Sequence, residues 1–246
     1  MEGEIGLIVD ATRQASRFLL RDYFELETLQ TSNRSSLNFS QKSCTRVSQV
    51  LQERLTKYFN TVIFDSQEVD KVNFTGKAVL VETIDGYFNL TRSLPFFAIM
   101  VTVVVRKDDK LIAEKSVMNF PALGEIYYVE KGKGAWLERH ASNFPGATRL
   151  RVSGTEEVKD AIISTPLSLI ELAKPFQGVR IFESCAYSLA QLIAGKIDII
   201  IAEPSNLTAS GVQLFTEEAA GACQTHGQRV VASNFKLTEK IKQLFS

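Results

Sequence analysis

Six runs of β-branched and aromatic residues in the middle of the chain constrain its fold more than any other feature. Turn residues such as Lys107-Asp-Asp-Lys and Gly132-Lys-Gly separate the last of these runs from one another. The runs are TVIF (61–64), KAVLVETI (77–84), FFAIMVTVVV (96–105), KLIAEKSVMNF (110–120), EIYYVE (125–130) and GAWLE (134–138). Short strands joined by tight turns pair with their chain neighbours, so the sequence predicts an antiparallel meander whose glycine turn is a β-hairpin.

The segments before this meander have helical periodicity. Apolar residues recur at helical spacing over 5–19, with arginines on another face, which predicts a long amphipathic helix. Residues 32–43 are polar and aperiodic and predict a loop. Helical spacing returns over 47–59 and predicts a second helix.

Strand-like and helix-like segments alternate after about Thr148. The predicted strands are 161–165, 179–183, 196–203 and 229–233, and the predicted helices are 185–195, 209–221, 237–245 and one that begins at Leu167. Alternation of this kind favours a mixed, largely parallel α/β layer. We therefore expect a helical plus antiparallel-sheet subdomain over 1–150 and an α/β subdomain over 151–246, joined without a flexible linker as one rigid unit.

Composition excludes several classes of function. Twenty-eight Lys plus Arg balance 28 Asp plus Glu, so no net charge attracts nucleic acid, and direct binding to it is not expected. Two histidines are too few for imidazole metal sites or Ser-His-Asp catalysis. Three distant cysteines, an acidic start and a longest apolar run of about half a bilayer span predict a reduced, cytoplasmic protein without a membrane segment.

Two carboxylates mark the end of the predicted strand 77–84. Glu82 and Asp85 stand just before the turn residue Gly86, and Glu68 precedes the strand. Mg²⁺ prefers carboxylate and carbonyl oxygens, so these residues are candidate ligands. The alternative, which spacing alone favours, is that they cap and solubilise a loop.

The surrounding residues give this segment a family resemblance. The stretch ETIDGYFNLTRSLPFF resembles the D-P-I-D-G-T-x-N-F-x-x-x-x-P-x-F motif of the inositol monophosphatase family, with Asp85, Gly86, Asn89, Pro95 and Phe97 in register. Three further blocks are similar to that family's: NFPALGEIYYVEKGKGAWLE, ESCAYSLAQLIAGKIDIIIAE and NLTASGVQLFTEEAAG. The resemblance is greatest to the bacterial SuhB (extragenic suppressor) type, and it implies an αβαβα layered fold.

The resemblance also implies a chemistry. Members of the family are Mg²⁺-dependent phosphomonoesterases in which carboxylates hold two or three metal ions and an Asp/Thr pair activates the attacking water. By this resemblance Glu68, Glu82 and Asp85 would supply metal-binding carboxylates and Ile84 a backbone carbonyl. Gly86 and Tyr87 would offer backbone amides to a phosphate group.

Three departures from the motifs alter this expectation. Tyr87 replaces the motif threonine, Cys44 stands at its partner aspartate, and Leu207 stands at a metal-binding aspartate. No residue is therefore assigned as catalytic, and Mg²⁺ binding is expected to be weak or absent. Because two-metal catalysis needs both ions and the activated water, we expect phosphatase activity to be impaired or lost.

The favoured interpretation is a protein that has lost activity but still binds a ligand or a protein partner. Two alternatives to it stay open. One is an active Mg²⁺-dependent phosphatase acting on inositol monophosphate or a related small sugar phosphate. The other is a structural homodimer without a ligand. Resemblance to the SuhB type implies pairing of two copies and a protein partner in the transcription machinery.

Overall fold

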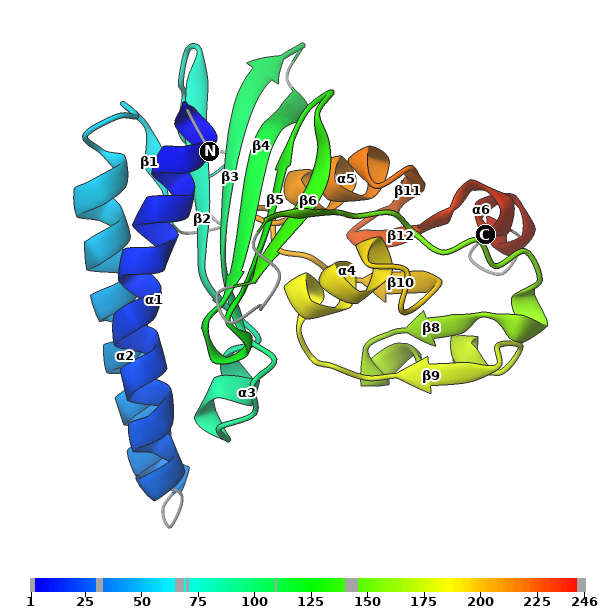
Figure 1. The fold of residues 1–246 in the computed structure, drawn as a ribbon, viewed down its shortest axis with the longest axis horizontal. Helices are drawn as coiled ribbons and strands as arrows, with labels where there is room; N and C mark the ends of the chain where they lie inside the picture. The colour runs from blue at the N-terminus through cyan, green and yellow to red at the C-terminus, as the bar shows by residue number, and fades with distance from the viewer. Residues whose placement is uncertain are drawn as a thin grey trace.

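A computed structural model of the chain describes residues 3–29, 33–64, 69, 71–108, 110–139 and 146–242, with the backbone alone at 27–29 and 33–36. Helices and sheets alternate as αβαβα layers (Figure 1). This architecture confirms the layered fold predicted from the sequence. Among the described residues, no helix is long and apolar enough to cross a membrane.

The first layer is an antiparallel pair of long helices, α1 (Glu4–Leu29) and α2 (Asn33–Leu55) (Figure 1). The first helix is confirmed, but the loop predicted over 32–43 is wrong because α2 already begins within it. Ser40 and Ser43 lie on the buried face of α2, at 0% and 1% exposure. Small hydroxyl residues can be buried between packed helices, yet they do not count as apolar in a periodicity.

The second layer is a seven-stranded sheet in the order β1-β2-β3-β4-β5-β6-β7. Its strands are β1 (Val62–Ile63), β2 (Lys77–Asp85), β3 (Ala98–Lys107), β4 (Lys110–Phe120), β5 (Glu125–Glu130), β6 (Gly134–Arg139) and β7 (Thr148–Arg149). From β2 to β7 every pairing is antiparallel, which confirms the meander. β1 instead pairs parallel with β2, so the run TVIF (61–64) does not belong to the antiparallel meander in which the sequence placed it.

Strand β2 is buried on both faces, which explains its continuous apolar run. Val79 and Val81 belong to the core under α1 and α2, whereas Ala78 and Leu80 belong to the core on the opposite face, and all four are fully buried. Glu82 and Asp85, near the carboxyl end of β2, are partly buried, while Thr83 and Ile84 between them remain buried.

Helices α4 (Cys185–Ile193) and α5 (Ala209–Glu218) form the third layer, between the two sheets. The second sheet has the order β11-β12-β10-β8-β9. Its strands are β8 (Ile162–Ser164), β9 (Gly178–Arg180), β10 (Ile199–Ala202), β11 (Gly221–His226) and β12 (Arg229–Asn234). The outer face is covered by η2 (Val158–Asp160), η3 (Leu167–Ala173) and α6 (Phe235–Ile241).

The second sheet is mixed, as predicted, but it is not largely parallel, because two of its pairings are parallel and two are antiparallel. Strand β11 is an element that the sequence did not predict. Its residues GACQTH lack apolar alternation, and the strand exists through its pairing with β12 across the turn at Gly227. The helix predicted from Leu167 is instead the 3₁₀ helix η3, which is interrupted at Leu169 (φ −115°) and lies between Pro166 and Pro175.

The glycine turn at 131–133 joins β5 to β6, which confirms the predicted hairpin. The carboxylate of Glu218, on α5, accepts hydrogen bonds from the backbone amides of Gly132 (2.6 Å) and Gly134 (2.8 Å). The turn therefore already holds an anionic group from within the protein and links the first sheet to the third layer.

Candidate functional site

The candidate site is built at the carboxyl end of β2. The pairing of β2 with β3 becomes irregular between Glu82 and Asp85, and Ile84 lies within this irregularity. Gly86 follows with φ +76°, and helix α3 (Tyr87–Thr91) begins directly after it. A side chain at Gly86 would clash with the backbone carbonyl of Phe96, so only glycine fits both the dihedral angle and the space.

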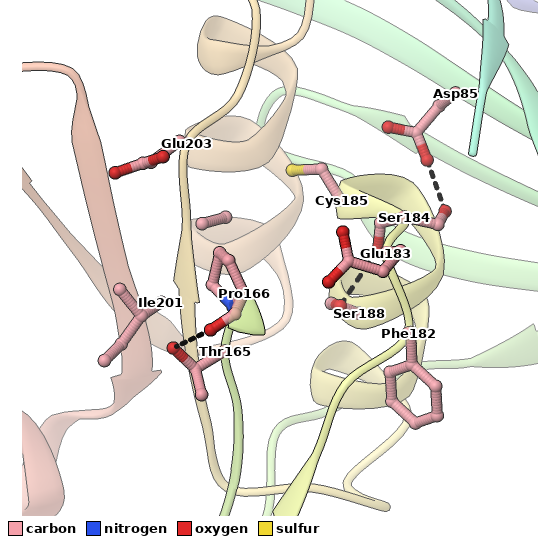
Figure 2. A pocket seen from close by; sticks show the side chains of 11 residues that line it. Asp85, Thr165, Pro166, Phe182, Glu183, Ser184, Cys185, Ser188, Ile201 and Glu203 are labelled. Atoms are coloured by element: carbon pink, nitrogen blue, oxygen red, sulfur yellow. Dashed lines mark hydrogen bonds between the residues drawn. The ribbon is translucent and has the colours of Figure 1, made fainter. Parts of the chain in front are cut away.

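Asp85 connects β2 to the start of α4. Its Oδ1 accepts a hydrogen bond from the Ser184 hydroxyl (Figure 2) and another from the backbone amide of Ala186 (3.1 Å). Ser184 is also the N-cap of α4, where its Oγ accepts from the amide of Tyr187 (3.1 Å). Burial raises the pKa of Asp85, and these hydrogen bonds partly oppose the rise. The carboxylate thus satisfies amides at a helix start, where negative charge is favoured.

Glu82 connects the same strand to a different segment. Its Oε2 accepts a 2.6 Å hydrogen bond from the hydroxyl of Ser205, in the loop between β10 and α5. Burial raises the pKa of Glu82; the Ser205 bond lowers it, and the nearby charge of Asp85 raises it further. The two carboxylates therefore contact two different parts of the third layer.

Cys44 and Tyr87 lie beside these carboxylates. Burial raises the pKa of the Cys44 thiol, and the charge of Glu82 raises it further. The Tyr87 hydroxyl donates to the backbone carbonyl of Leu37 on α2 (3.3 Å), and its pKa is raised by burial and by Cys44. The structure thus brings together residues from α2, β2 and α3 that are far apart in the sequence.

Leu207 packs into the interior. Its side chain is only 3% exposed and belongs to the hydrophobic core between the two sheets. A hydrocarbon side chain offers no ligand atom to a cation.

These groups do not fit a two-metal Mg²⁺ site. Mg²⁺ requires near-octahedral oxygen ligands. Cys44 offers a thiol and Leu207 a hydrocarbon side chain at positions where the family resemblance implies carboxylates. Glu68 lies outside the described residues, and no group of three or more acidic, cysteine or histidine side chains among those described could hold a metal ion. The metal-ligand assignment for Glu68, Glu82, Ile84 and Asp85 stays a prediction, as does phosphate binding at Gly86 and Tyr87.

A pocket of about 280 Å³ opens beside Asp85, toward the second sheet (Figure 2). Its apolar lining comes from Pro166, Phe182, Cys185, Ile201 and Ala202. The polar lining residues are Asp85, Thr165, Glu183, Ser184, Ser188 and Glu203. Glu203 is paired with Arg229 (3.1 Å), and Glu183 accepts from the amide of Leu167 (3.5 Å). None of the described lining residues is basic.

The two serines that the carboxylates contact were not predicted from the sequence. Ser184 had a local signal, because a serine directly before an apolar helical run is a typical N-cap. Ser205 had none, since its contact with Glu82 joins residues 123 positions apart.

Comparison with known proteins finds similarity to one protein family. Residues 6–240 match the sequence model of the "Inositol monophosphatase family". An inositol-1-monophosphatase from Caulobacter vibrioides is 28% identical over 260 aligned residues, which cover 95% of this chain and 97% of that protein. Nus factor SuhB from Escherichia coli (strain K12) is 22% identical over 213 residues, covering 80% and 75% respectively.

Solved structures agree in fold. The extragenic suppressor protein SuhB from Bartonella henselae superposes with a TM-score of 0.78 at 21% identity, covering 100% of this chain and 99% of that one. An inositol monophosphatase from Anabaena gives a TM-score of 0.76 at 16% identity, covering 98% and 94%. At these identities the likeness concerns the fold.

Proposed function

The chain belongs to the inositol monophosphatase family, and from that premise we propose that it is a non-hydrolysing member that binds a small polyol. The observation that carries the proposal is the set of side chains at and beside the carboxyl end of β2. Both carboxylates at the end of β2 accept hydrogen bonds from the protein's own serines, and Cys44, Tyr87 and Leu207 stand where the family resemblance implies catalytic and metal-binding groups.

The pocket supports the choice of ligand. Its carboxylates are hydrogen-bond acceptors, and its serine and threonine hydroxyls can both donate and accept, which suits a molecule with several hydroxyl groups. A phosphate monoester carries about −1.5 to −2 charges at neutral pH and would meet three acidic side chains there. At about 280 Å³ the pocket is at the small end for ligand sites. A neutral polyol such as myo-inositol is therefore expected to bind more tightly than its phosphate.

The direct test is phosphate release. Purified protein with inositol 1-phosphate and millimolar Mg²⁺ or Mn²⁺ should release no more phosphate than its Asp85→Asn variant. Calorimetry with myo-inositol and with inositol 1-phosphate tests the ligand preference in the same samples. A metal-dependent rate of about 1 per second or faster that is lost in Asp85→Asn would establish the competing phosphatase function instead.

A protein partner belongs to the same proposal. The similarity to a protein named Nus factor SuhB supports a partner in the transcription machinery, and pairing of two copies is proposed with it. Light scattering after size exclusion tests the pairing. Co-purification with tagged RNA polymerase from the native host, with and without an excess of myo-inositol, tests the partner and its dependence on the pocket.

A further inference from the structure

We infer that Glu82 and Ser205 form a latch that fixes the β10–α5 loop to the first sheet without a metal ion. The inference concerns how the β10–α5 loop is held against β2, and it goes beyond the proposed function. It assigns Glu82 a structural role, although the family resemblance implies a metal ligand at that position. It assigns Ser205 the role of positioning the loop.

The loop is short and is anchored at several points. It runs from Glu203 to Thr208, between the end of β10 and the start of α5. Glu203 pairs with Arg229, and Leu207 packs into the core. Ser205 contacts β2 through its 2.6 Å hydrogen bond to Glu82.

Ser205 also organises the start of α5. Its backbone carbonyl accepts from the amides of Thr208 and Ala209, each at 3.0 Å. Its hydroxyl lies 3.3 Å from that of Thr208 while it donates to Glu82. Holding the Ser205 side chain therefore holds the first turn of the helix.

The length of the Glu82 side chain is what allows this contact. An aspartate at this position is shorter by one carbon–carbon bond, about 1.5 Å. With the backbone unchanged, its oxygen would lie roughly 4 Å from the Ser205 hydroxyl, which is too far for a hydrogen bond. Glutamate in place of the motif aspartate therefore gives this position a side chain long enough to contact Ser205.

The latch affects the pocket because a residue of the β10–α5 loop lines one side of that pocket. Glu203 lines the pocket beside Asp85 and lies two residues before Ser205. Asp85 fixes the opposite wall through Ser184 and Ala186. The two carboxylates of β2 thus hold two walls of one pocket by direct hydrogen bonds.

Two substitutions separate a latch from a metal ligand. Glu82→Gln keeps the length and the acceptor oxygen but removes the charge, whereas Glu82→Asp keeps the charge and shortens the side chain. A latch tolerates glutamine and is weakened by aspartate. A Mg²⁺ ligand shows the opposite preference, because it needs the charge.

The experiment measures melting temperature and amide hydrogen exchange of the full chain, in EDTA and in millimolar Mg²⁺. We expect Glu82→Gln to melt within about 1 °C of the native protein, and Glu82→Asp and Ser205→Ala to melt about 2–4 °C lower, as for loss of one buried hydrogen bond. The amides of Thr208 and Ala209 should exchange faster in the latter two variants only. Combining Glu82→Asp with Ser205→Ala should add little to either, since both remove the same bond.

Ser48→Ala is the matched control. It removes another hydroxyl contact to β2, the 3.0 Å pair between Ser48 and Thr83, outside the loop. It should lower the melting temperature while leaving exchange at Thr208 and Ala209 unchanged. The inference is overturned if Glu82→Gln accelerates that exchange as much as Glu82→Asp, or if Mg²⁺ stabilises the native protein and Glu82→Gln abolishes the gain. These stability readouts are independent of phosphate release, so the latch and the proposed function can fail separately.

Discussion

Replacing Leu207 with aspartate returns a carboxylate to the position where the family resemblance implies a metal ligand. In this chain Leu207 is 3% exposed within the core between the sheets. The substitution removes a buried hydrocarbon side chain and puts a charge in its place. We therefore expect it to damage the fold without creating a metal site.

The magnitude follows from burial. Leu207→Ala should lower the free energy of unfolding by about 3 kcal/mol through the lost side chain and the cavity. For a chain of this size that corresponds to a drop in melting temperature of about 6–12 °C. Leu207→Asn has nearly the shape of the aspartate without its charge and should cost about 1–3 kcal/mol more, because it buries a polar group. Leu207→Asp should be the least stable of the three at neutral pH.

The assay is thermal unfolding of the three variants in EDTA and in Mg²⁺. Leu207→Asn is the matched control for Leu207→Asp, since only the charge differs. We expect Mg²⁺ to leave both melting temperatures unchanged. A functional metal site occupied at about 100 times its dissociation constant would add about 2.7 kcal/mol to the aspartate variant alone. A Mg²⁺-dependent rise of about 5 °C or more in Leu207→Asp, absent in Leu207→Asn, would show that this position still forms a metal site.

Three further outcomes are expected. Gly86→Ala should lower stability by about 2 kcal/mol or more, through its positive φ and a clash with a backbone carbonyl, and a denaturant titration that finds no loss would contradict this. The hydrogen bond from Lys115 lowers the pKa of Glu4, so the stability that this glutamate contributes is present at neutral pH and is lost as the pH falls below about 4.3. The difference in melting temperature between the native protein and Glu4→Gln should therefore shrink on acidification, and a constant difference would contradict this. Burial raises the pKa of Cys223 to about 12 and that of Cys185 well above its ordinary value, so Ellman's reagent at pH 8 should modify both much more slowly in folded than in unfolded protein, and equal rates would show that they are accessible thiolates.

Local patterns predicted the elements whose apolar residues repeat regularly. The period over 5–19 identified α1, and the runs from 77 to 138 identified the strands β2 to β6. These strands are recognisable because each one is buried on at least one face and turn residues mark its ends.

Other elements depend on partners that the local sequence does not specify. Strand β11 lacks an apolar pattern and forms by pairing with β12. The first turns of α2 contain several serines and one arginine, and the buried Ser40 and Ser43 suit close helix packing although they have weak helix propensity. In both cases tertiary contacts override the local signal.

The candidate site shows the same division. Asp85 and Gly86 could be placed at a strand end from the motif alone, because hydrophobic strand, carboxylate and glycine follow in order. The partners of the carboxylates could not, since Ser184 and Ser205 lie about 100 residues or more away along the chain. Which serine hydroxyl meets which carboxylate is decided by how the third layer packs on the first sheet.

The most direct test of the account is a crystal of the protein soaked in Mn²⁺, with anomalous difference density calculated at the end of β2. We predict no manganese bound to Glu82, with its side chain still accepting from Ser205 and Asp85 still accepting from Ser184. Two anomalous peaks about 4 Å apart, with Glu82 and Asp85 turned toward them as ligands, would contradict both the latch and the loss of two-metal chemistry.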